Sequence, residues 1–408
     1  MGKPHEYSTS LRRRPEGPLT PYIDAFLRLL STQGYSRASI LLYTRLVADF
    51  SRWLKNRGVS GEEITADHAG RYLRTRARPA RGGASTLKQL LNLLRQEGAI
   101  KQQATPERST PAQRLLDEYA SYLRRERELK DQALRKYVRF ARCFLTERFG
   151  SRPPRLSLLK AADVVRFVQG QAARRSPQAT KLLITALRSF LVYARYRGYI
   201  TTDLAVAVPT VANWSMASIP RSISPDHAQR LLAHCTRESA VGRRDYAILL
   251  LLARLGLRAN EVAFLELEDI NWEASCLRVR GKGGYHSMLP LPTDVGEAIA
   301  AYLQVGRPAT TSRYVFLRAK APIRGFTSAE AVGLVVRRAF TRAGIESPHK
   351  GAHQFRHALA CGMLRKGASL LEIGEILRHR SPQTTAIYAK VDLDSLRPLA
   401  FAWPGGVR

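Results

Sequence analysis

Four segments in the second half of the chain carry side chains that could act together on a phosphate. They are GLRANE, GKGG, HQFRH and LRHRSPQTTAIY, and they supply Arg258, Lys282, His353, Arg356, His379 and Tyr388. Each residue alone is most simply explained as solvated or packed. Together they provide two guanidiniums to neutralise phosphate oxygens, a phenol that can become a covalent nucleophile, and a lysine and histidines for proton transfer. The combination indicates phosphodiester chemistry without a metal.

The segment HQFRH is expected to begin a helix. Residues three apart share one face of a helix, so His353 and Arg356 can address the same target. His353 and His357 are four apart and resemble half of a zinc site, but no Glu follows His353 and no third ligand is evident. The four cysteines are scattered without CxxC spacing. We therefore predict no metal site and no cofactor.

Local signals position the tyrosine and the first arginine. Ser381-Pro382 reads as a helix start, which places Tyr388 about six residues into a short final helix and nine residues after His379. SLLE, from Ser369, reads as a capping box that starts the preceding helix. Further upstream, Gly256 is expected to end an apolar helix, and Arg258 to open the next helix.

The segment CLRVRGKGGYHSMLPLP alternates apolar and polar residues on both sides of a glycine-rich turn. This pattern predicts a β-hairpin, with Lys282 in its turn. The surrounding sequence has helical periodicity. We therefore predict a mostly helical domain with a small β-sheet or hairpin over residues 222–408.

The first half of the chain repeats one helical pattern. A stripe of Tyr43, Leu46, Phe50 and Leu54 recurs as Tyr137, Phe140 and Phe144, and the offset drifts from about 94 to 100 residues. We predict two all-helical modules, over residues 18–104 and 112–208, after a disordered basic leader at 1–17. The fold class is thus mainly α, with an α+β domain at the C-terminal end.

The chain is strongly basic. It has 66 Lys and Arg against 33 Asp and Glu, a formal net charge of +33. This excess favours a polyanionic partner, and an arginine-rich composition suits phosphate recognition. Candidate contacts to a DNA backbone lie in and after QAARRSPQATK: Arg174, Arg175, Lys181 and Arg188. No apolar run approaches the roughly 18 residues of a membrane span.

The order and intervals of the four segments resemble the motifs of the tyrosine recombinases, also called the phage integrase family. Three residues separate His353 from Arg356, 23 separate Arg356 from His379, and nine separate His379 from Tyr388. The second helical module looks like the family's core-binding domain. The first looks like an additional domain of the same type, as in some transposon-borne members.

The resemblance implies a nucleophile and a phosphate clamp. Tyr388 would attack the scissile phosphate, forming a 3′-phosphotyrosyl bond and releasing a 5′-hydroxyl. Arg258 and Arg356 would hold that phosphate, and Glu261 would orient Arg258 and its helix. The bond energy would be conserved in the tyrosyl link, so neither ATP nor a metal would be needed.

It also implies roles in proton transfer and hydrogen bonding. Lys282 would protonate the leaving 5′-oxygen, His353 would assist proton transfer, and His379 would hydrogen-bond a non-bridging oxygen. Two positions depart from the family pattern. Tyr285, His286 and Ser287 follow GKGG, where the family often has basic residues. Arg378 replaces the usual glycine before the histidine, and either changes the backbone there or adds a phosphate contact.

The resemblance further implies a site-specific recombinase that serves a mobile element, by integration, excision or transposition. Its partner would be double-stranded DNA, held by a homo-tetramer on two sites, with or without sister recombinases. The segment after Tyr388 would pack on a neighbouring subunit. We expect the protein in a bacterial cytoplasm, with the nucleoid. The alternatives are a type IB topoisomerase and a non-catalytic DNA-binding accessory protein.

Overall fold

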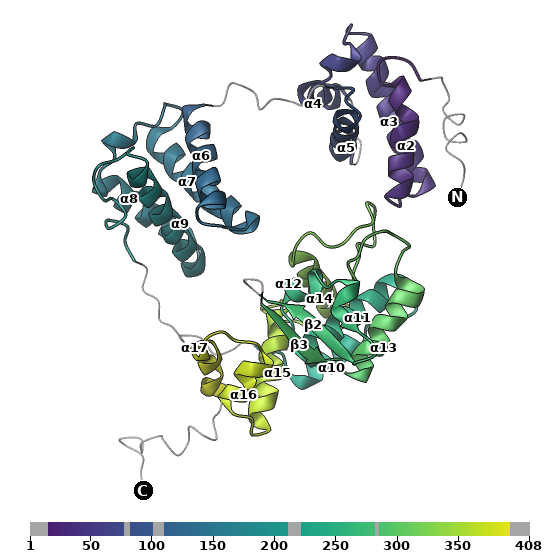
Figure 1. Ribbon diagram of the computed structural model, residues 1–408, viewed down its shortest axis with the longest axis vertical. Coiled ribbons are helices and arrows are strands. Elements are labelled where there is room, and N and C mark those ends of the chain that lie inside the picture. The colour runs from purple at the N-terminus through teal and green to yellow at the C-terminus, as the bar shows by residue number, and fades with distance from the viewer. Residues whose placement is uncertain (1–14, 77–81, 101–109, 211–221, 282–284, 392–408) are drawn as a thin grey trace. The chain divides into compact units, whose positions relative to one another are not determined.

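The computed structural model describes residues 15–76, 82–100, 110–210, 222–281 and 285–391 (Figure 1). Residues 1–14 of the predicted leader, Lys282 and the segment from residue 392 lie outside the described residues. Within the described residues α-helices dominate and three short strands form one antiparallel sheet, which confirms the predicted fold class. No helix in these ranges is both long and apolar enough to cross a membrane.

The first module is a bundle of four helices: α2 (Ile23–Thr32), α3 (Arg37–Lys55), α4 (Ala66–Thr75) and α5 (Gly83–Gln96). Ser36 and Thr65 are the N-cap residues of α3 and α4. The side-chain oxygen of each accepts the backbone N–H of the third residue of its helix. The apolar stripes of the four helices face one another. Their core includes Phe26, Phe50 and Leu90, each fully buried.

The second module repeats this order with α6 (Pro111–Arg125), α7 (Asp131–Phe149), α8 (Ala161–Ala172) and α9 (Pro177–Tyr196). In both modules a single 3₁₀ turn precedes the third helix (Gly61–Glu63 and Leu156–Leu158). The second, third and fourth helices start 94, 95 and 94 residues later than their counterparts (37 to 131, 66 to 161, 83 to 177). Residues 101–215 form a compact unit around their own core.

The C-terminal domain surrounds α11 (Ala240–Leu255), whose apolar run from Ala247 to Leu252 is almost completely buried. The helices around it are α10 (Pro225–Ala233), α12 (Ala259–Ala263), α13 (Thr293–Ala301) and α14 (Glu330–Arg342). They and the sheet share one large core. A helix buried on all sides is expected where its sequence is apolar all round.

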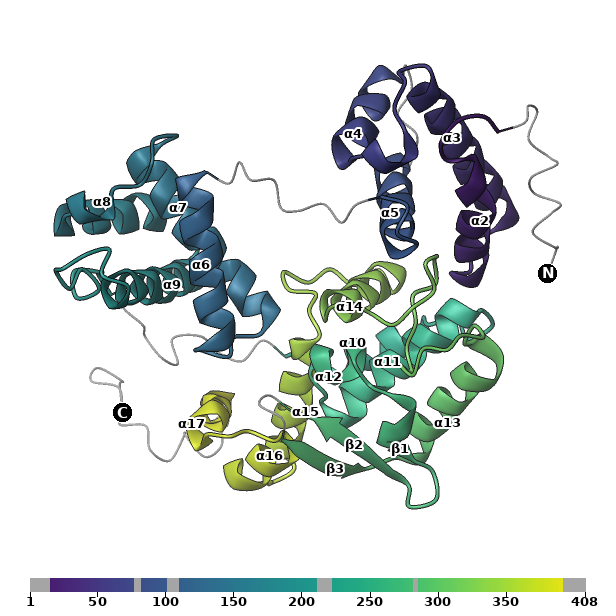
Figure 2. The same ribbon diagram turned by 45° about the horizontal axis from the view of Figure 1, so that its top comes forward.

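The predicted hairpin is confirmed. β2 (Cys276–Arg280) pairs antiparallel with β3 (His286–Pro290) (Figure 2). In this register Arg280 lies opposite His286. A two-residue strand that the sequence pattern did not indicate, β1 (Ile270–Asn271), pairs with the other edge of β2. Leu277 and Val279 point into the core, whereas Arg278 and Arg280 point outward, as the alternation predicts.

The last elements form a small core of their own. They are α15 (His353–Arg365), α16 (Leu370–Ile376), α17 (Pro382–Thr385) and a 3₁₀ helix, η6 (Ala386–Val391). The predicted capping box of Ser369 and Glu372 is present. Pro382 occupies the first turn of α17, as predicted, but the Ser381 side chain makes no capping hydrogen bond. The fully buried members of this core include Ala360, Ile373, Leu377 and Tyr388.

The second module and the C-terminal domain have separate hydrophobic cores. A mutation in one core should therefore destabilise only the part of the chain that surrounds it. Phe144 is fully buried in the second module, and its ring contacts those of Phe167 and Phe190. Replacing Phe144 by Ala should lower the free energy of unfolding of residues 101–215 by about 3–5 kcal/mol. Hydrogen exchange should accelerate in that unit and stay unchanged in the core around α11.

The control is Val192→Ala on α9, since Val192 is 46% exposed and should change stability by less than about 0.5 kcal/mol. Equal acceleration of exchange throughout the chain in Phe144→Ala would contradict the separation of the cores.

Candidate active site

The first arginine of the site is held where two helices meet. Gly256 ends α11 with a φ of +56°, a left-handed conformation that glycine adopts without strain. Arg258 follows as the N-cap residue of α12. Its backbone N–H donates to Glu261 Oε2 at 2.8 Å, and its Nη1 donates to Glu261 Oε1 at 2.7 Å. Glu261 is buried, whereas the Arg258 side chain is 35% exposed, so Arg258 presents an oriented positive charge to solvent.

The second arginine is buried. Arg356 lies in the first turn of α15 and is 3% exposed. Its Nη1 donates to the Gly256 carbonyl oxygen at 2.6 Å, and its Nη2 donates to the Leu377 carbonyl oxygen. Burial, and then the charge of Arg258, lowers the pKa of Arg356 to about 10. The guanidinium therefore stays charged at neutral pH.

Arg378 is part of the same network. Its φ is +55°, so it has the left-handed backbone for which glycine would be the ordinary choice. Its carbonyl oxygen accepts from Arg258 Nη2 at 3.3 Å, and its own Nη2 donates to Glu261 Oε2 at 3.0 Å. The Arg378 side chain is only 11% exposed, and its bonds hold Glu261 and Arg258 in place. The predicted phosphate contact of Arg378 stays a prediction.

Tyr388 lies six residues after Pro382 in the final helical segment, as predicted, and this segment changes from the α-helix α17 to the 3₁₀ helix η6 after Thr385. The tyrosine is 1% exposed. Burial raises the pKa of Tyr388 to about 12, while the charges of Arg356 and Arg258 oppose that rise. Its Oη lies 3.0 Å from Nδ1 of His357, a residue that the sequence suggested only as half of a metal site.

His379 stacks beside the tyrosine. The two rings are 6.4 Å apart between centroids and nearly parallel, at 8°. His379 Nδ1 lies 2.8 Å from the hydroxyl of Thr385, a partner that no sequence signal indicated. Burial, followed by the charge of Arg356, lowers the pKa of His379 to about 4.

His353 begins α15, and its pKa is also lowered, by partial burial and then by the charges of Arg356 and Arg258. His353 is the exposed one of the three histidines around Tyr388. The structure therefore brings together Arg258, Glu261, His353, Arg356, His379 and Tyr388, all from segments that the sequence singled out.

The site has more positive charge and more hydrogen-bond donors than the described residues satisfy. One carboxylate, Glu261, faces the guanidiniums of Arg258 and Arg378, and Arg356 bonds to carbonyl oxygens. A guanidinium has five N–H donors, and the bonds of Arg258 and Arg356 described above use two each. The Nε of Arg378 is buried without a partner in the described ranges. Such a site favours an anion that accepts several hydrogen bonds.

The four residues of the second module that are predicted to contact DNA differ in their exposure and in their hydrogen bonds. Arg174 is exposed after α8. Arg175 donates from Nε to Gln171 at 2.9 Å, and Arg188 donates to the Val208 carbonyl oxygen at 2.8 Å. Lys181 lies half-buried on the first turns of α9. Each of these four positions stays a prediction.

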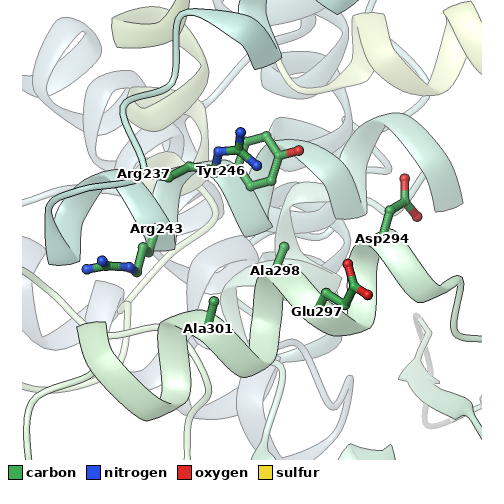
Figure 3. A pocket seen from close by; sticks show the side chains of 7 residues that line it. All are labelled: Arg237, Arg243, Tyr246, Asp294, Glu297, Ala298 and Ala301. Atoms are coloured by element: carbon green, nitrogen blue, oxygen red, sulfur yellow. The ribbon is translucent and has the colours of Figure 1, made fainter.

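Among the residues that the structure describes, no three His, Cys, Asp or Glu side chains are grouped so that they could hold a metal ion. A hollow of about 240 Å³ lies between α11 and α13, lined by arginines and carboxylates that include Arg237, Arg243 and Glu297 (Figure 3). In it, the Arg237 guanidinium covers the Tyr246 ring at 4.9 Å. None of the predicted site residues lines this hollow.

Comparison with known proteins gives the family. The profile of the phage integrase family matches residues 221–394, and that of the phage integrase N-terminal SAM-like domain matches residues 23–98. The putative integrase/recombinase y4rA of Sinorhizobium fredii (strain NBRC 101917 / NGR234) is 52% identical over 398 residues, which cover 97% of each chain. The chain belongs to the phage integrase family. It is thus a tyrosine recombinase by descent, as the motifs predicted.

Solved structures show the same fold. A XerH site-specific recombinase bound to a palindromic difH substrate, in a post-cleavage complex, matches with a TM-score of 0.58 and 19% identity, over 73% of this chain and 98% of that one. A lambda integrase tetramer bound to a Holliday junction matches with a TM-score of 0.51 and 18% identity, over 76% and 87%. The SAM-like profile matches the first helical module of this recombinase, in line with the prediction that this module is of the core-binding type.

The position of Arg378 gives a prediction about stability. Arg378→Ala loses the ion pair with Glu261 but keeps a side chain at a φ of +55°. Arg378→Gly loses the same ion pair and relieves the backbone, so it should be more stable than Arg378→Ala by roughly 1 kcal/mol. Thermal melts of the two variants measure this difference. Equal stabilities would contradict the strain assigned to this backbone.

The half-buried His379 gives a prediction about how the stability of the protein depends on pH. An unfolded histidine titrates near 6.5, whereas the pKa of His379 is lowered to about 4 in the folded protein. Between these values the unfolded chain binds more protons, so stability should fall as the pH is lowered from about 6.5 towards 4. His379→Asn should reduce the loss of Tm between pH 7 and pH 5.

The matched control is His234→Asn, because His234 is exposed at the end of α10. That variant should lose as much Tm as the unchanged protein. If His379→Asn did the same, the buried neutral state of His379 would be refuted.

Proposed function

We propose that this recombinase acts at specific DNA sites, cutting and rejoining strands through a 3′-phosphotyrosyl intermediate. The observation that carries the proposal is the position of the Tyr388 phenol within the field of Arg356 and Arg258. Burial raises the pKa of this phenol, and the positive charges of the two arginines oppose that rise. An attacking phenol must develop negative charge beside the phosphate. The two guanidiniums stabilise the negative charge of the phenol oxygen and that of the phosphate.

In the cleavage step, Tyr388 Oη attacks the scissile phosphorus and the bond from phosphorus to the 5′-oxygen breaks. Arg258 and Arg356 bind the non-bridging oxygens and neutralise the charge that grows on them in the transition state. Glu261 keeps Arg258 oriented, a role supported by the 2.7 Å pair between them. Rejoining is the reverse, with a 5′-hydroxyl as nucleophile, so no ATP is consumed.

The remaining residues complete the chemistry. Lys282, which lies outside the described residues, protonates the leaving 5′-oxygen. His353, exposed at the start of α15, assists proton transfer, and His379 donates a hydrogen bond to a non-bridging oxygen. The low pKa of His379 keeps it neutral, so it donates from one ring nitrogen without adding a further charge.

The substrate is double-stranded DNA, and the active assembly is a homo-tetramer on two sites, with or without sister recombinases. The net charge of +33 supports a polyanionic partner. Two recombinases with the same fold were solved on DNA, one of them as a tetramer on a Holliday junction. Exposed basic residues such as Arg174 contact the backbone, and the segment from residue 392 links subunits. The protein serves a mobile element and works at the bacterial nucleoid.

The test is covalent trapping. A DNA segment that the protein protects in a footprint is nicked beside the cleavage position, so that the fragment carrying the 5′-hydroxyl diffuses away. The unchanged protein should accumulate a protein–DNA adduct that survives denaturation, and Tyr388→Phe should form none. Arg258→Ala should slow adduct formation by roughly 10²–10³-fold, the usual loss for one group that stabilises transition-state charge.

The outcomes separate the candidate activities. Exchange of strands between two copies of the protected segment supports a recombinase, whereas adducts on any DNA with relaxation of supercoils alone would indicate a topoisomerase. Sequence-specific binding without any adduct would indicate an accessory protein and would refute the proposal. Tyr302→Phe serves as the control, since Tyr302 is also buried but belongs to the core around α11.

A further inference from the structure

His357 contacts the reacting atom of the tyrosine, and the roles set out above do not include it. It lies on α15, one turn beyond His353 and next to Arg356. Its Nδ1 is 3.0 Å from Tyr388 Oη, and the two rings meet edge to face at 5.7 Å. The Tyr388 ring also stacks on the ring of His379, so the phenol contacts two imidazoles.

The tautomer of His357 sets the direction of its hydrogen bond with Tyr388. Burial, and then the charges of His353 and Arg356, lowers the pKa of His357, and burial raises the pKa of Tyr388. Both side chains are therefore neutral at rest. A neutral imidazole can accept at Nδ1 when its proton is on Nε2, and a neutral phenol donates. In that tautomer the Tyr388 hydroxyl points its proton at His357.

We propose that His357 is the proton acceptor for Tyr388 in strand cleavage and the proton donor in rejoining. This inference rests on the function proposed above. As the bond from Oη to phosphorus forms, the Oη proton passes to His357 Nδ1, while the bond from phosphorus to the 5′-oxygen breaks and that oxygen takes a proton from Lys282. In rejoining, the 5′-hydroxyl oxygen bonds to phosphorus and gives its proton back to Lys282, while the bond from phosphorus to Oη breaks and the His357 imidazolium returns its proton to Oη.

The surroundings of His357 make it a base that acts only with DNA bound. In the free protein the groups that interact with it are the cationic Arg356 and the histidines His353 and His379, so a proton on His357 would add to an existing positive charge. A bound phosphate supplies negative charge at the same place. It therefore favours protonation of His357 when the tyrosine must lose its proton.

The competing explanation is that His357 only latches the tyrosine in a buried resting position. The two explanations predict opposite changes in the rate of cleavage when His357 is replaced. Loss of a latch would speed cleavage, whereas loss of a proton acceptor would slow it. Asparagine is the informative replacement, because its side-chain oxygen lies near the Nδ1 position and accepts a hydrogen bond but is not basic.

The first experiment measures single-turnover adduct formation on the nicked DNA. His357→Asn should slow both adduct formation and rejoining by about 10²–10⁴-fold, the usual contribution of a general base. His234→Asn should react at the unchanged rate. Cleavage by His357→Asn that is as fast as, or faster than, that of the unchanged protein would overturn the inference, and would leave the function intact as long as the unchanged protein forms adducts.

The second experiment removes the tyrosine proton from the reaction. In a Tyr388→Phe background, a DNA strand that ends in a 3′-p-nitrophenyl phosphate is attacked by the 5′-hydroxyl of a second strand, and p-nitrophenolate leaves without needing a proton. Adding His357→Asn should not change this rate, because no tyrosine takes part. A loss as large as that in the cleavage reaction would show that His357 only supports the site, and would overturn the inference.

Discussion

The buried guanidinium of Arg356 joins the parts of the catalytic domain that must meet for the reaction. Its two terminal nitrogens bond to the carbonyl oxygens of Gly256 and Leu377, residues 100 and 21 positions away in the chain. Gly256 ends α11 and Leu377 ends α16. Carbonyl oxygens at helix C-termini carry partial negative charge, so they stabilise a cation that has no carboxylate of its own.

This arrangement ties the large core around α11 to the small core that holds Tyr388. Arg258 follows Gly256 by two residues, and His379 follows Leu377 by two, so the bonds of Arg356 set the spacing between Arg258 and the residues around Tyr388. Glu261 and Arg378 also hold Arg258 through hydrogen bonds. These bonds orient the charges of the site in the absence of a ligand, which is the arrangement that the proposed catalysis by preorganised charge requires.

Much of this could be predicted from local patterns. Residues three apart on a helix share a face, which placed His353 beside Arg356, and the capping box at Ser369 marked the start of α16 correctly. Alternation of apolar and polar residues indicated the hairpin, and the structure gives its register. These signals depend on neighbours within a few positions along the chain, so the sequence alone contains them.

The sequence by itself determined which chemical groups the site has and on which elements they lie, because helix and strand periodicity and the spacing of the motifs are local properties. Only the tertiary structure decided which groups touch. The side chain of Arg378 could have turned outward to a phosphate, but the fold places it against Glu261, 117 residues away. The contact between His357 and Tyr388 spans 31 residues and depends on how η6 packs on α15. Such contacts depend on packing between distant segments, which no local pattern specifies.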